Sequence, residues 1–390
     1  TGFPWSLSVQ NTKNARERAY KVQTLLAGEL NTLGVTISLQ SANRETLVNI
    51  KRRNISSEVF EDLQQRFARD GVYTYTDLIL GLPGDSYDTF TASVSHVVAN
   101  GQHNHVQFHN CSILPNAEMA NPEYRDKFGI SSVPQRIVNA WDNVDRPDEV
   151  PEYLDTVVST ATMDDTDWEK AKVFAWMVDL LYFDRLLQVP LSVLMARHKL
   201  PLKGFVEAFM RAVPEGCPTV AGVVERLWAH ARSIRLGGIE YQSSDRFGSI
   251  HMPADQYALA ALVADGLLPS FYREAEQILV DHLTAIQVTE SPLLLGDLID
   301  YNEACFVAPA PAGRRLLVLS HPINEVYRRV LGGGSGDVEE RWAMYSIDRK
   351  TRPVESLDDF LGHLAWCHGK DKRNYLAATA PARIVQPRVA

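Results

Sequence analysis

The chain has 390 residues, enough for two or three domains of ordinary size. Hydrophobic residues make up 45% and charged residues 22%, as in a typical globular protein. The net charge of −9 and the lack of a long basic run argue against nucleic-acid binding by bulk electrostatics.

Targeting and redox signals are sparse. No stretch of about 18 uncharged apolar residues and no signal peptide occur, so we expect no membrane association. The four cysteines lie far apart and fit no CxxC-type spacing, which predicts reduced thiols in a cytoplasmic protein and no metal ligands in this chain. Because the sequence begins with Thr1 and not Met, we expect a fragment or a processed product.

The first 130 residues alternate between the period-2 pattern of strands and the 3.6-residue pattern of helices. We expect strands at 5–9, 35–39, 72–80 and 105–113, and helices at 15–33, 43–53, 57–70 and 87–100. This rhythm predicts an α/β fold with parallel strands and right-handed crossovers. The strand at 5–9 would be an uncovered edge unless earlier strands precede it, which argues for missing N-terminal sequence.

The rest of the chain predicts a mainly helical α+β region. We expect a Pro- and Asp-rich irregular connector at 131–167, a helical domain at 168–283, a small α+β region at 284–376 and a poorly ordered tail at 377–390. Within them we predict one buried helix at 168–187, a helical stretch at 254–283 broken near Pro269, strands at 285–288, 294–300, 304–307, 315–320 and 342–347, and a helix at 357–367.

The segment 38–52 places polar residues where a strand ends and a helix begins. Gln40 and Ser41 end the strand, and Asn43 begins the helix. In parallel α/β folds the carboxyl ends of strands build the site, where polar groups can hold a ribose or a carboxylate. Arg52 could fold back and offer a bidentate fork to a carboxylate. On spacing alone, a plainer interpretation is favoured, in which Asn43 only caps a helix and Arg52 is solvated.

The segment 73–90 carries a second polar position. Alternation puts Tyr75, Asp77 and Ile79 on one face of the strand. An Asp in an apolar strand needs a partner such as a ligand amine, a hydroxyl or an Arg. Gly81 and Gly84 bracket a turn that would let a flat ring approach the backbone. A plain strand-to-helix turn is an equally good interpretation of this segment alone.

Together the two segments resemble the radical S-adenosylmethionine (SAM) superfamily. The pattern Leu-Gln-Ser-x-Asn with a later Ile-x-Arg, over 39–52, resembles its fourth strand, and Asp-Leu-Ile-x-Gly-Leu-Pro-Gly, over 77–84, resembles its fifth. Residues 108–119 resemble the sixth strand and its exit loop. The resemblance covers about the first 130 residues and implies part of a parallel (β/α) barrel.

The resemblance also implies which residues bind SAM. They are Gln40, Ser41, Asn43, Arg52, Asp77, Leu80, Gly81 and Leu82. Gln40 and Asp77 match positions that contact the ribose or the amino-acid portion of SAM, and Arg52 matches one that contacts the carboxylate. The backbone of 80–82 matches the adenine-binding edge, while Ser41 and Asn43 lie beside these positions. No catalytic residue can be assigned.

This sequence departs from the family in one large respect. Family members hold a [4Fe–4S] cluster with a Cys-x3-Cys-x2-Cys loop, and no such loop is present here. The glycine-rich segment that binds the SAM amino group is also absent. The resemblance implies that both lie in missing N-terminal sequence, so we expect this chain alone to be inactive. It further implies an external electron donor and a small-molecule or peptide substrate.

Looser matches point to the cobalamin-binding subgroup. Residues 3–14, the helical extension and the end His368–Tyr375 resemble its members, which implies cobalamin as a further cofactor and methyl transfer. Two alternatives stay open. One is a radical SAM enzyme without cobalamin, of the anaerobic coproporphyrinogen oxidase type. The other is a noncatalytic barrel remnant that binds SAM or a partner.

Four further residues lie on the strand at 105–113 or just before it. His103, His105 and His109 share one face by parity, and three histidines can ligate zinc. Their spacing is not a standard one, and proximity to a cluster or substrate is the better interpretation for His109. Cys111 is predicted to be a buried core residue, with a thiol facing the substrate as the alternative.

Overall fold

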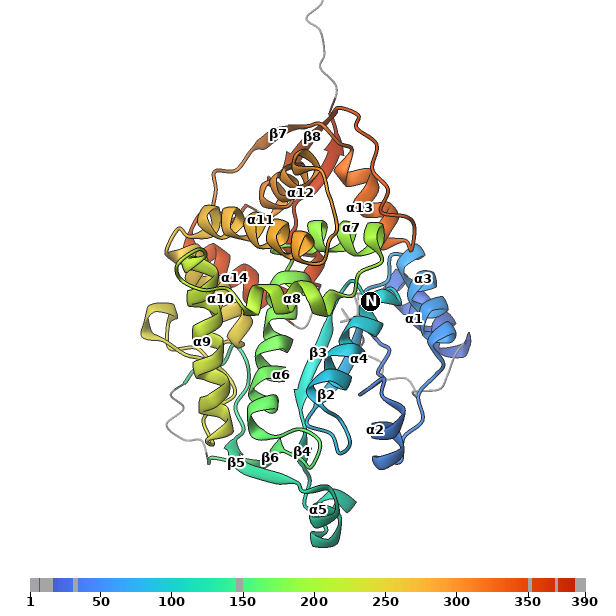
Figure 1. Cartoon of the computed structure of the whole chain (residues 1–390), viewed down its shortest axis with the longest axis vertical. Helices are drawn as coiled ribbons and strands as arrows, with labels where there is room; N and C mark the ends of the chain where they lie inside the picture. Colours follow the sequence, from blue (N-terminus) through green and yellow to red (C-terminus); the bar gives the residue numbers. More distant parts are fainter. Residues whose placement is uncertain are drawn as a thin grey trace, which may run out of the picture.

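The computed structural model describes residues 7, 17–30, 34–144, 150–349, 353–368 and 371–382, and it is a mixed α/β structure (Figure 1). The strand predicted at 5–9 lies outside these residues, apart from Leu7. Helix α1 (Glu17–Glu29) lies inside the predicted helix at 15–33.

A small parallel sheet forms the first part of the molecule. Its strands are β1 (Val35–Thr36), β2 (Thr74–Leu80) and β3 (Val106–Asn110), in the order β1-β2-β3. An isolated parallel bridge between Gln40 and Leu78 continues the pairing beyond β1. The predicted parallel βαβ arrangement is therefore confirmed. Within the described residues, these three strands form an open sheet and do not close into a barrel.

The connecting helices cover one face of this sheet. They are α2 (Arg44–Asn49), α3 (Ser57–Arg69) and α4 (Tyr87–Ala99). Residues alternate along β2 between buried and half-buried, and Tyr75, Asp77 and Ile79 are the half-buried set. On β3, Phe108 packs toward Phe90 of α4, with ring centroids 6.1 Å apart. The opposite face of the sheet is thus left to carry polar side chains.

A second sheet corrects the prediction of an irregular connector at 131–167. Strands β4 (Ser112–Ile113), β5 (Ser131–Arg136) and β6 (Tyr153–Ser159) pair antiparallel in the order β4-β6-β5. Pro134 is compatible with β5 because that strand lies at the edge of its sheet. The strand predicted at 105–113 is split, since β3 pairs with β2 whereas β4 pairs with β6. Helix α5 (Pro122–Phe128) lies between β4 and β5.

The middle of the chain is helical, as predicted. Its helices are α6 (Asp165–Val178), α7 (Gln188–His198), α8 (Leu202–Met210), α9 (Pro218–Arg235), α10 (Ala254–Ala264) and α11 (Leu268–Ala285). The break predicted near Pro269 is confirmed. Residues 168–187 are buried as expected, but they are not one helix. A π-helical turn (Asp179–Phe183) follows α6, and Arg185 has a positive φ of 66°.

The last third contains several errors of prediction. Helix α12 (Pro292–Cys305) occupies the region where strands were predicted at 294–300 and 304–307, and the described structure has no strand at 285–288. The predictions at 315–320, 342–347 and 357–367 are confirmed by β7 (Arg314–Leu319), β8 (Ala343–Asp348) and α14 (Leu357–Cys367). Helix α13 (Ile323–Leu331) follows β7, and β9 (Ala378–Pro381) pairs with β8 where a disordered tail was expected.

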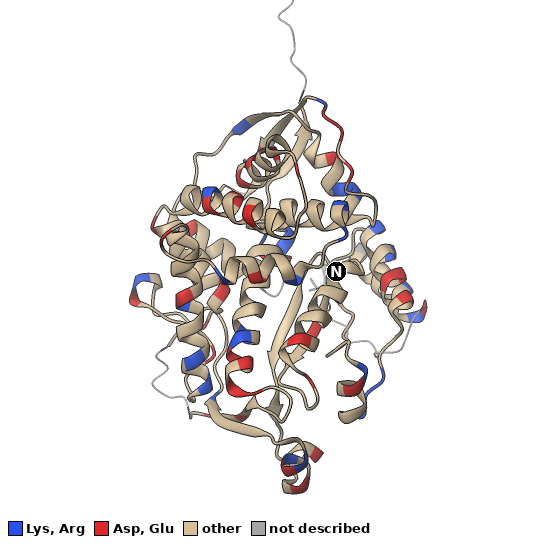
Figure 2. Ribbon diagram, viewed as in Figure 1, with Lys and Arg blue, Asp and Glu red and all other residues tan. Residues whose placement is uncertain are grey.

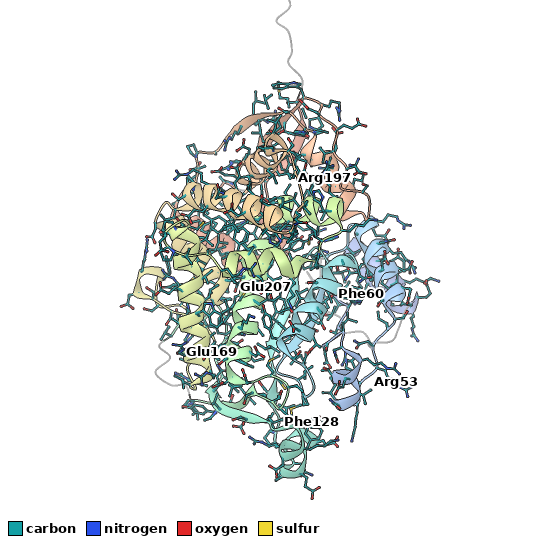
Figure 3. The ribbon with its side chains drawn as sticks, viewed as in Figure 1. Arg53, Phe60, Phe128, Glu169, Arg197 and Glu207 are labelled. Atoms are coloured by element: carbon teal, nitrogen blue, oxygen red, sulfur yellow. The ribbon has the colours of Figure 1, made fainter. Side chains whose placement is uncertain are left out.

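Most of these parts share one large apolar core. Its buried side chains extend from Val35 on β1 to Tyr375 near the end of the chain, and a second, smaller cluster lies around Cys111 and Val157. Polar side chains also join the helices to one another, and Figure 3 labels two of them, Glu169 of α6 and Glu207 of α8. Glu169 pairs with Arg235, and Glu207 accepts a hydrogen bond of 2.8 Å from the Tyr87 hydroxyl.

The surface charges lie on many elements and do not gather on one face in the view of Figure 2. None of the helices in the described ranges is both long enough and apolar enough to cross a bilayer.

Candidate functional site

Asp77, in the middle of β2, is the centre of a polar group just beyond the carboxyl end of β1. Its carboxylate accepts a hydrogen bond from the Ser38 hydroxyl. On the neighbouring strand, His109 Nε2 lies 3.5 Å from Asp77 Oδ1. The Asp77 side chain is 23% exposed, so it can still be reached from the open face of the sheet. The sequence predicts that Asp77 needs a polar partner, and in the structure Ser38 and His109 provide it.

Arg52 folds back over the same strand ends. Its Nη2 lies 3.5 Å from the Ser38 carbonyl oxygen, and its Nε donates a 3.3 Å hydrogen bond to Asn54. Asn54 in turn donates to the Ser41 carbonyl oxygen at 2.8 Å. Burial lowers the pKa of the Arg52 guanidinium, and the nearby Asp77 opposes that shift. Arg52 is thus half-buried and in contact with the protein, and SAM binding by its guanidinium stays a prediction.

The other residues of segment 38–52 have mainly local roles in the structure. Gln40 has a φ of +65° and keeps two backbone hydrogen bonds to β2, with Asp77 at 2.8 Å and Ile79 at 2.9 Å. Ser41 is buried, and its hydroxyl accepts from the Asn43 amide at 3.0 Å. Asn43 caps α2 by accepting from the amide of Thr46 at 2.9 Å. The capping interpretation of Asn43 is thus confirmed, and SAM contacts by these three residues stay predictions.

The Leu80–Leu82 turn lies tightly against the protein. Leu80 and Leu82 are buried, and Gly81 has a φ of +88°. A Cβ on Gly81 would lie 3.5 Å from Trp168 Nε1, an ordinary contact, so the positive φ and not lack of space favours glycine here. The Leu80 carbonyl oxygen accepts from the Cys111 amide at 2.8 Å. Adenine binding along this edge stays a prediction.

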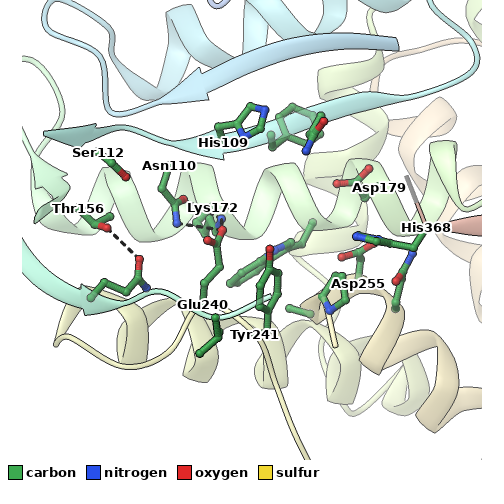
Figure 4. Close-up of a pocket in the computed structure, with 18 of the residues that line it drawn as sticks. His109, Asn110, Ser112, Thr156, Lys172, Asp179, Glu240, Tyr241, Asp255 and His368 are labelled. Atoms are coloured by element: carbon green, nitrogen blue, oxygen red, sulfur yellow. Dashed lines mark hydrogen bonds and ion pairs between the residues drawn. The ribbon is translucent and has the colours of Figure 1, made fainter. Parts of the chain in front are cut away.

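A cavity of about 390 Å³ opens beside this group, within the range of small-molecule sites (Figure 4). Side chains that line it from β2, β3, α6 and the π-helical turn are Tyr75, Gln107, His109, Lys172, Trp176 and Asp179. The eight predicted SAM residues do not line it. His109 joins the two regions, because it lines the cavity and also approaches Asp77.

An ion pair between buried Lys172 and half-buried Glu240 lines the cavity toward the carboxyl end of β3. Lys172 is 3% exposed, and its Nζ donates to Asn110 Oδ1 at 2.8 Å and to Glu240 Oε1 at 3.1 Å. Asn110 also donates to Glu240 at 3.1 Å. These contacts join the end of β3, helix α6 and the segment after α9.

The other end is acidic. Lys372 lies 2.8 Å from Asp184 Oδ1 and 3.3 Å from Asp179 Oδ1. Burial alone would lower the pKa of Lys372, but Asp179, Asp184 and Asp255 outweigh it and hold that pKa above its usual value. Burial raises the pKa of Asp179 to about 7, although Lys372 opposes the shift. Burial also raises the pKa of Asp255 well above its ordinary value, with Asp184 adding to the effect.

The histidines of this region are not arranged as metal ligands. His103 is hydrogen-bonded to the Tyr182 hydroxyl at 2.8 Å, and burial lowers its pKa to about 4. His105 lines the cavity, and burial holds its pKa well below the usual value. Within the ranges that the structure describes, no three His, Cys, Asp or Glu side chains are grouped so that they could hold a metal ion. These residues therefore do not fit a [4Fe–4S] cluster.

Cys111 is a core residue. It is 4% exposed and packs with Leu82, Ile113, Ile130 and Val157, and burial raises its pKa to about 12. The alternative of a reactive thiol facing the substrate is not favoured by this environment.

The sequence interpretation missed the charged lining of the cavity. Lys172 and Asp179 lie in the run 168–187, which the sequence predicts as one buried helix. Charged side chains within an apolar helix are rarely buried without a partner, and that signal could have identified them. Lys372, Glu240 and Asp255 carry no comparable local signal.

The fold and the polar strand ends define a class: an α/β protein with a carboxylate–guanidinium site at the carboxyl ends of parallel strands. No protein-family model matches the chain. Two curated relatives narrow the class. The 2-(S-pantetheinyl)-carbapenam-3-carboxylate methyltransferase of Streptantibioticus cattleyicolor is 30% identical over 224 residues, which are 57% of this chain and 33% of the relative.

The second relative is the cobalamin-dependent radical SAM methyltransferase TokK of Streptomyces tokunonensis, 30% identical over 181 residues. The match covers 46% of this chain and 26% of TokK. The resemblance to the cobalamin-binding branch of the radical SAM superfamily is thereby confirmed. The matches span about a third and a quarter of the lengths of these relatives.

Proposed function

We propose that this chain is part of a cobalamin-dependent radical SAM methyltransferase and that it supplies one wall of the SAM site together with a substrate cavity. The observation that carries the proposal is the convergence of Ser38, Arg52 and Asp77 beyond the carboxyl end of β1, beside the middle of β2. Both curated relatives are methyltransferases, which supports the reaction class.

Each polar group has a role that its contacts support. Arg52 presents a guanidinium above the strand ends, where it can bind the SAM carboxylate. Asp77 is positioned to accept hydrogen bonds from the ribose hydroxyls, and Ser38 orients its carboxylate. His109 separates this site from the cavity and would contact both ligands. When bound, SAM supplies the methyl group and, on reductive cleavage, the radical that activates the substrate.

The proposal also covers cofactors, partners and location. Cobalamin, a [4Fe–4S] cluster and an external electron donor belong to it as expectations from the family, and no step of cluster chemistry is assigned to the described residues. The substrate is proposed to be a small molecule or peptide held in the cavity. A cytoplasmic location is proposed because Cys111, Cys217, Cys305 and Cys367 are free thiols.

The test is a calorimetric titration with SAM of the 390-residue chain and of the longest natural polypeptide that contains it. Arg52→Met should weaken SAM binding by about tenfold or more, because a charge-assisted hydrogen bond is lost. Arg53→Met is the matched control, since Arg53 is the adjacent exposed residue (Figure 3), and its affinity should stay within about twofold. Failure of both polypeptides to bind SAM, or equal losses in the two variants, would overturn the proposal.

A further inference from the structure

The acidic end of the cavity consists of Asp179, Asp184 and Asp255 around Lys372. Asp179 and Asp255 are 8% and 4% exposed and line the cavity, while Asp184 is fully buried behind them. Figure 4 shows Asp179 and Asp255 on opposite sides of this end, with His368 beside them. Three carboxyl groups therefore share one ammonium group.

Other charged groups nearby do not balance the excess. The Arg185 guanidinium donates to the Lys372 carbonyl oxygen at 2.8 Å and to the Tyr327 hydroxyl at 3.1 Å, and it makes no ion pair with a carboxylate in the described part of the chain. Lys172 is paired with Glu240 at the other end. Burial lowers the pKa of His368 to about 4 and that of His105 well below its usual value, so both rings are neutral at pH 7.

Asp255 is a buried acid that faces the cavity without a cation of its own. Its side chain is 4% exposed and lines the cavity, and it makes no ion pair within the described residues. Burial and the neighbouring carboxyl group of Asp184 both oppose its ionisation and raise its pKa well above the ordinary value. A cation that entered the cavity would therefore meet an acid whose ionisation it can stabilise.

We propose that this acidic end binds a cationic amine of the substrate, with Asp255 and Asp179 as its acceptors. As the ammonium group enters, Asp255 releases its proton to solvent and the new carboxylate pairs with the cation. A metal ion is a weaker candidate, because the described residues offer no grouped set of three ligands. The inference rests on the proposed function for the assumption that this cavity holds the substrate.

The geometry also orients the bound molecule. The cavity extends along β2 and β3 from Tyr73 and His105, near the strand starts, to Asn110 and Ser112 at the carboxyl ends. An amine anchored by Asp179 and Asp255 places the remainder of the substrate toward His109 and the proposed SAM site. The structure thus assigns a substrate with its amine at one end and the methyl-accepting atom at the other.

The probes are n-butylammonium, 1-butanol and butyrate, which have similar chain lengths and carry positive, zero and negative charge. Ligand-observed NMR on the 390-residue chain should show the ammonium binding about tenfold or more tightly than the alcohol, with butyrate the weakest. Calorimetry at pH 7 in two buffers of different ionisation enthalpy should show proton release as the ammonium binds.

Asp255→Asn should abolish both the ammonium preference and the proton release, because the Asn side chain cannot ionise and so cannot pair with the cation. Asp179→Asn should reduce the preference without removing the proton release. Asp88→Asn, which neutralises an 83% exposed carboxylate, is the control and should leave both unchanged. Circular dichroism verifies that each variant is folded.

Equal binding of the ammonium and the alcohol, or an unchanged preference in Asp255→Asn, would overturn the inference. SAM titration of the same samples keeps the two proposals apart. Intact SAM binding without amine preference rejects only the amine site, whereas amine preference without SAM binding rejects the proposed function and leaves the site.

Discussion

At the scale of single residues, buried polar groups mark where this protein departs from an ordinary core. Arg52 and Asp77 are held at the strand ends by Ser38 and Asn54, and Lys172 and Lys372 are each 3% exposed beside the cavity. Placing such groups away from water costs free energy unless partners compensate. Each of these four side chains has a polar partner. At the acidic end of the cavity, however, the carboxyl groups outnumber the cations.

Asp85 gives a test of this cost. It is 1% exposed, and burial raises its pKa from 3.8 to about 6, although the Thr89 hydroxyl donates to it. Because the folded pKa lies above the unfolded one, stability is lost as the pH rises from about 4 to about 6. Asp85→Asn should therefore gain stability over the wild type across that window, reaching on the order of 2 kcal/mol above pH 6.

Urea unfolding of both proteins between pH 4.5 and 8 measures the difference. Asp126→Asn, which changes an exposed carboxylate on α5, should follow the wild-type pH profile. A loss of stability in Asp85→Asn that is the same at pH 5 and pH 8 would show that the hydrogen bond from Thr89, and not ionisation, dominates.

At the scale of elements, the turns at the ends of the parallel strands depend on backbone conformations that favour glycine. Gly81 and Gly84 both have a φ of +88°. The side chain of Asn49 on α2 reaches this turn and donates to the Pro83 carbonyl oxygen at 3.2 Å. The turn thus brings α2 and the end of β2 together, where the SAM site is proposed.

Gly84→Ala should destabilise the protein by about 1–3 kcal/mol, because its Cβ would lie 2.3 Å from Asn49 Nδ2 at a positive φ. Gly71→Ala separates the two causes, since Gly71 has a φ of +71° but nothing within 4 Å of its Cβ. Gly222→Ala, in the open on helix α9, should instead stabilise by about 0.5–1 kcal/mol. Urea midpoints measure all three, and equal costs for Gly84→Ala and Gly71→Ala would exclude the Asn49 contact.

At the scale of the whole molecule, polar links at the cavity hold the parallel sheet to the helical region. Lys172 connects β3 through Asn110 with the segment after α9 through Glu240. Lys372 connects the end of the chain with Asp179 and Asp184. The cavity is therefore built from segments that are far apart in sequence.

Lys172→Met should lower the free energy of unfolding by about 2 kcal/mol, because it leaves Glu240 without its cation. The double variant Lys172→Met/Glu240→Gln should recover part of that loss. The exposed pair of Lys51 and Glu118, 69% and 54% exposed, provides the comparison, and Lys51→Met should cost less than about 1 kcal/mol. Similar costs at the two sites, measured by urea unfolding, would contradict a buried structural link.

Local sequence patterns predicted some helices and strands correctly and others wrongly, and the wrong predictions have physical reasons. The apolar run at 294–300 predicts a strand, whereas Ser291 and Pro292 just before it are a helix start signal. The structure follows the second signal, and Ser291 caps α12 by accepting a hydrogen bond from the Leu294 amide. The prolines at 131–167 predict an irregular segment, because proline is rare in strands, yet β5 and β6 form there. Pro134 is tolerated only because β5 is an edge strand, and strand order is not encoded locally.

The sequence by itself determined the parallel strand–helix rhythm, the turn glycines and the two motifs that indicated a radical SAM relative. These are local, since each depends on residues within one βα unit. Tertiary structure decided that Arg52 turns back to the strand ends, that His109 lies beside Asp77, and that Lys172, Asp179, Asp255 and Lys372 enclose one cavity. Those contacts join residues up to about 200 positions apart, so the packing of the common core and not any local pattern creates them.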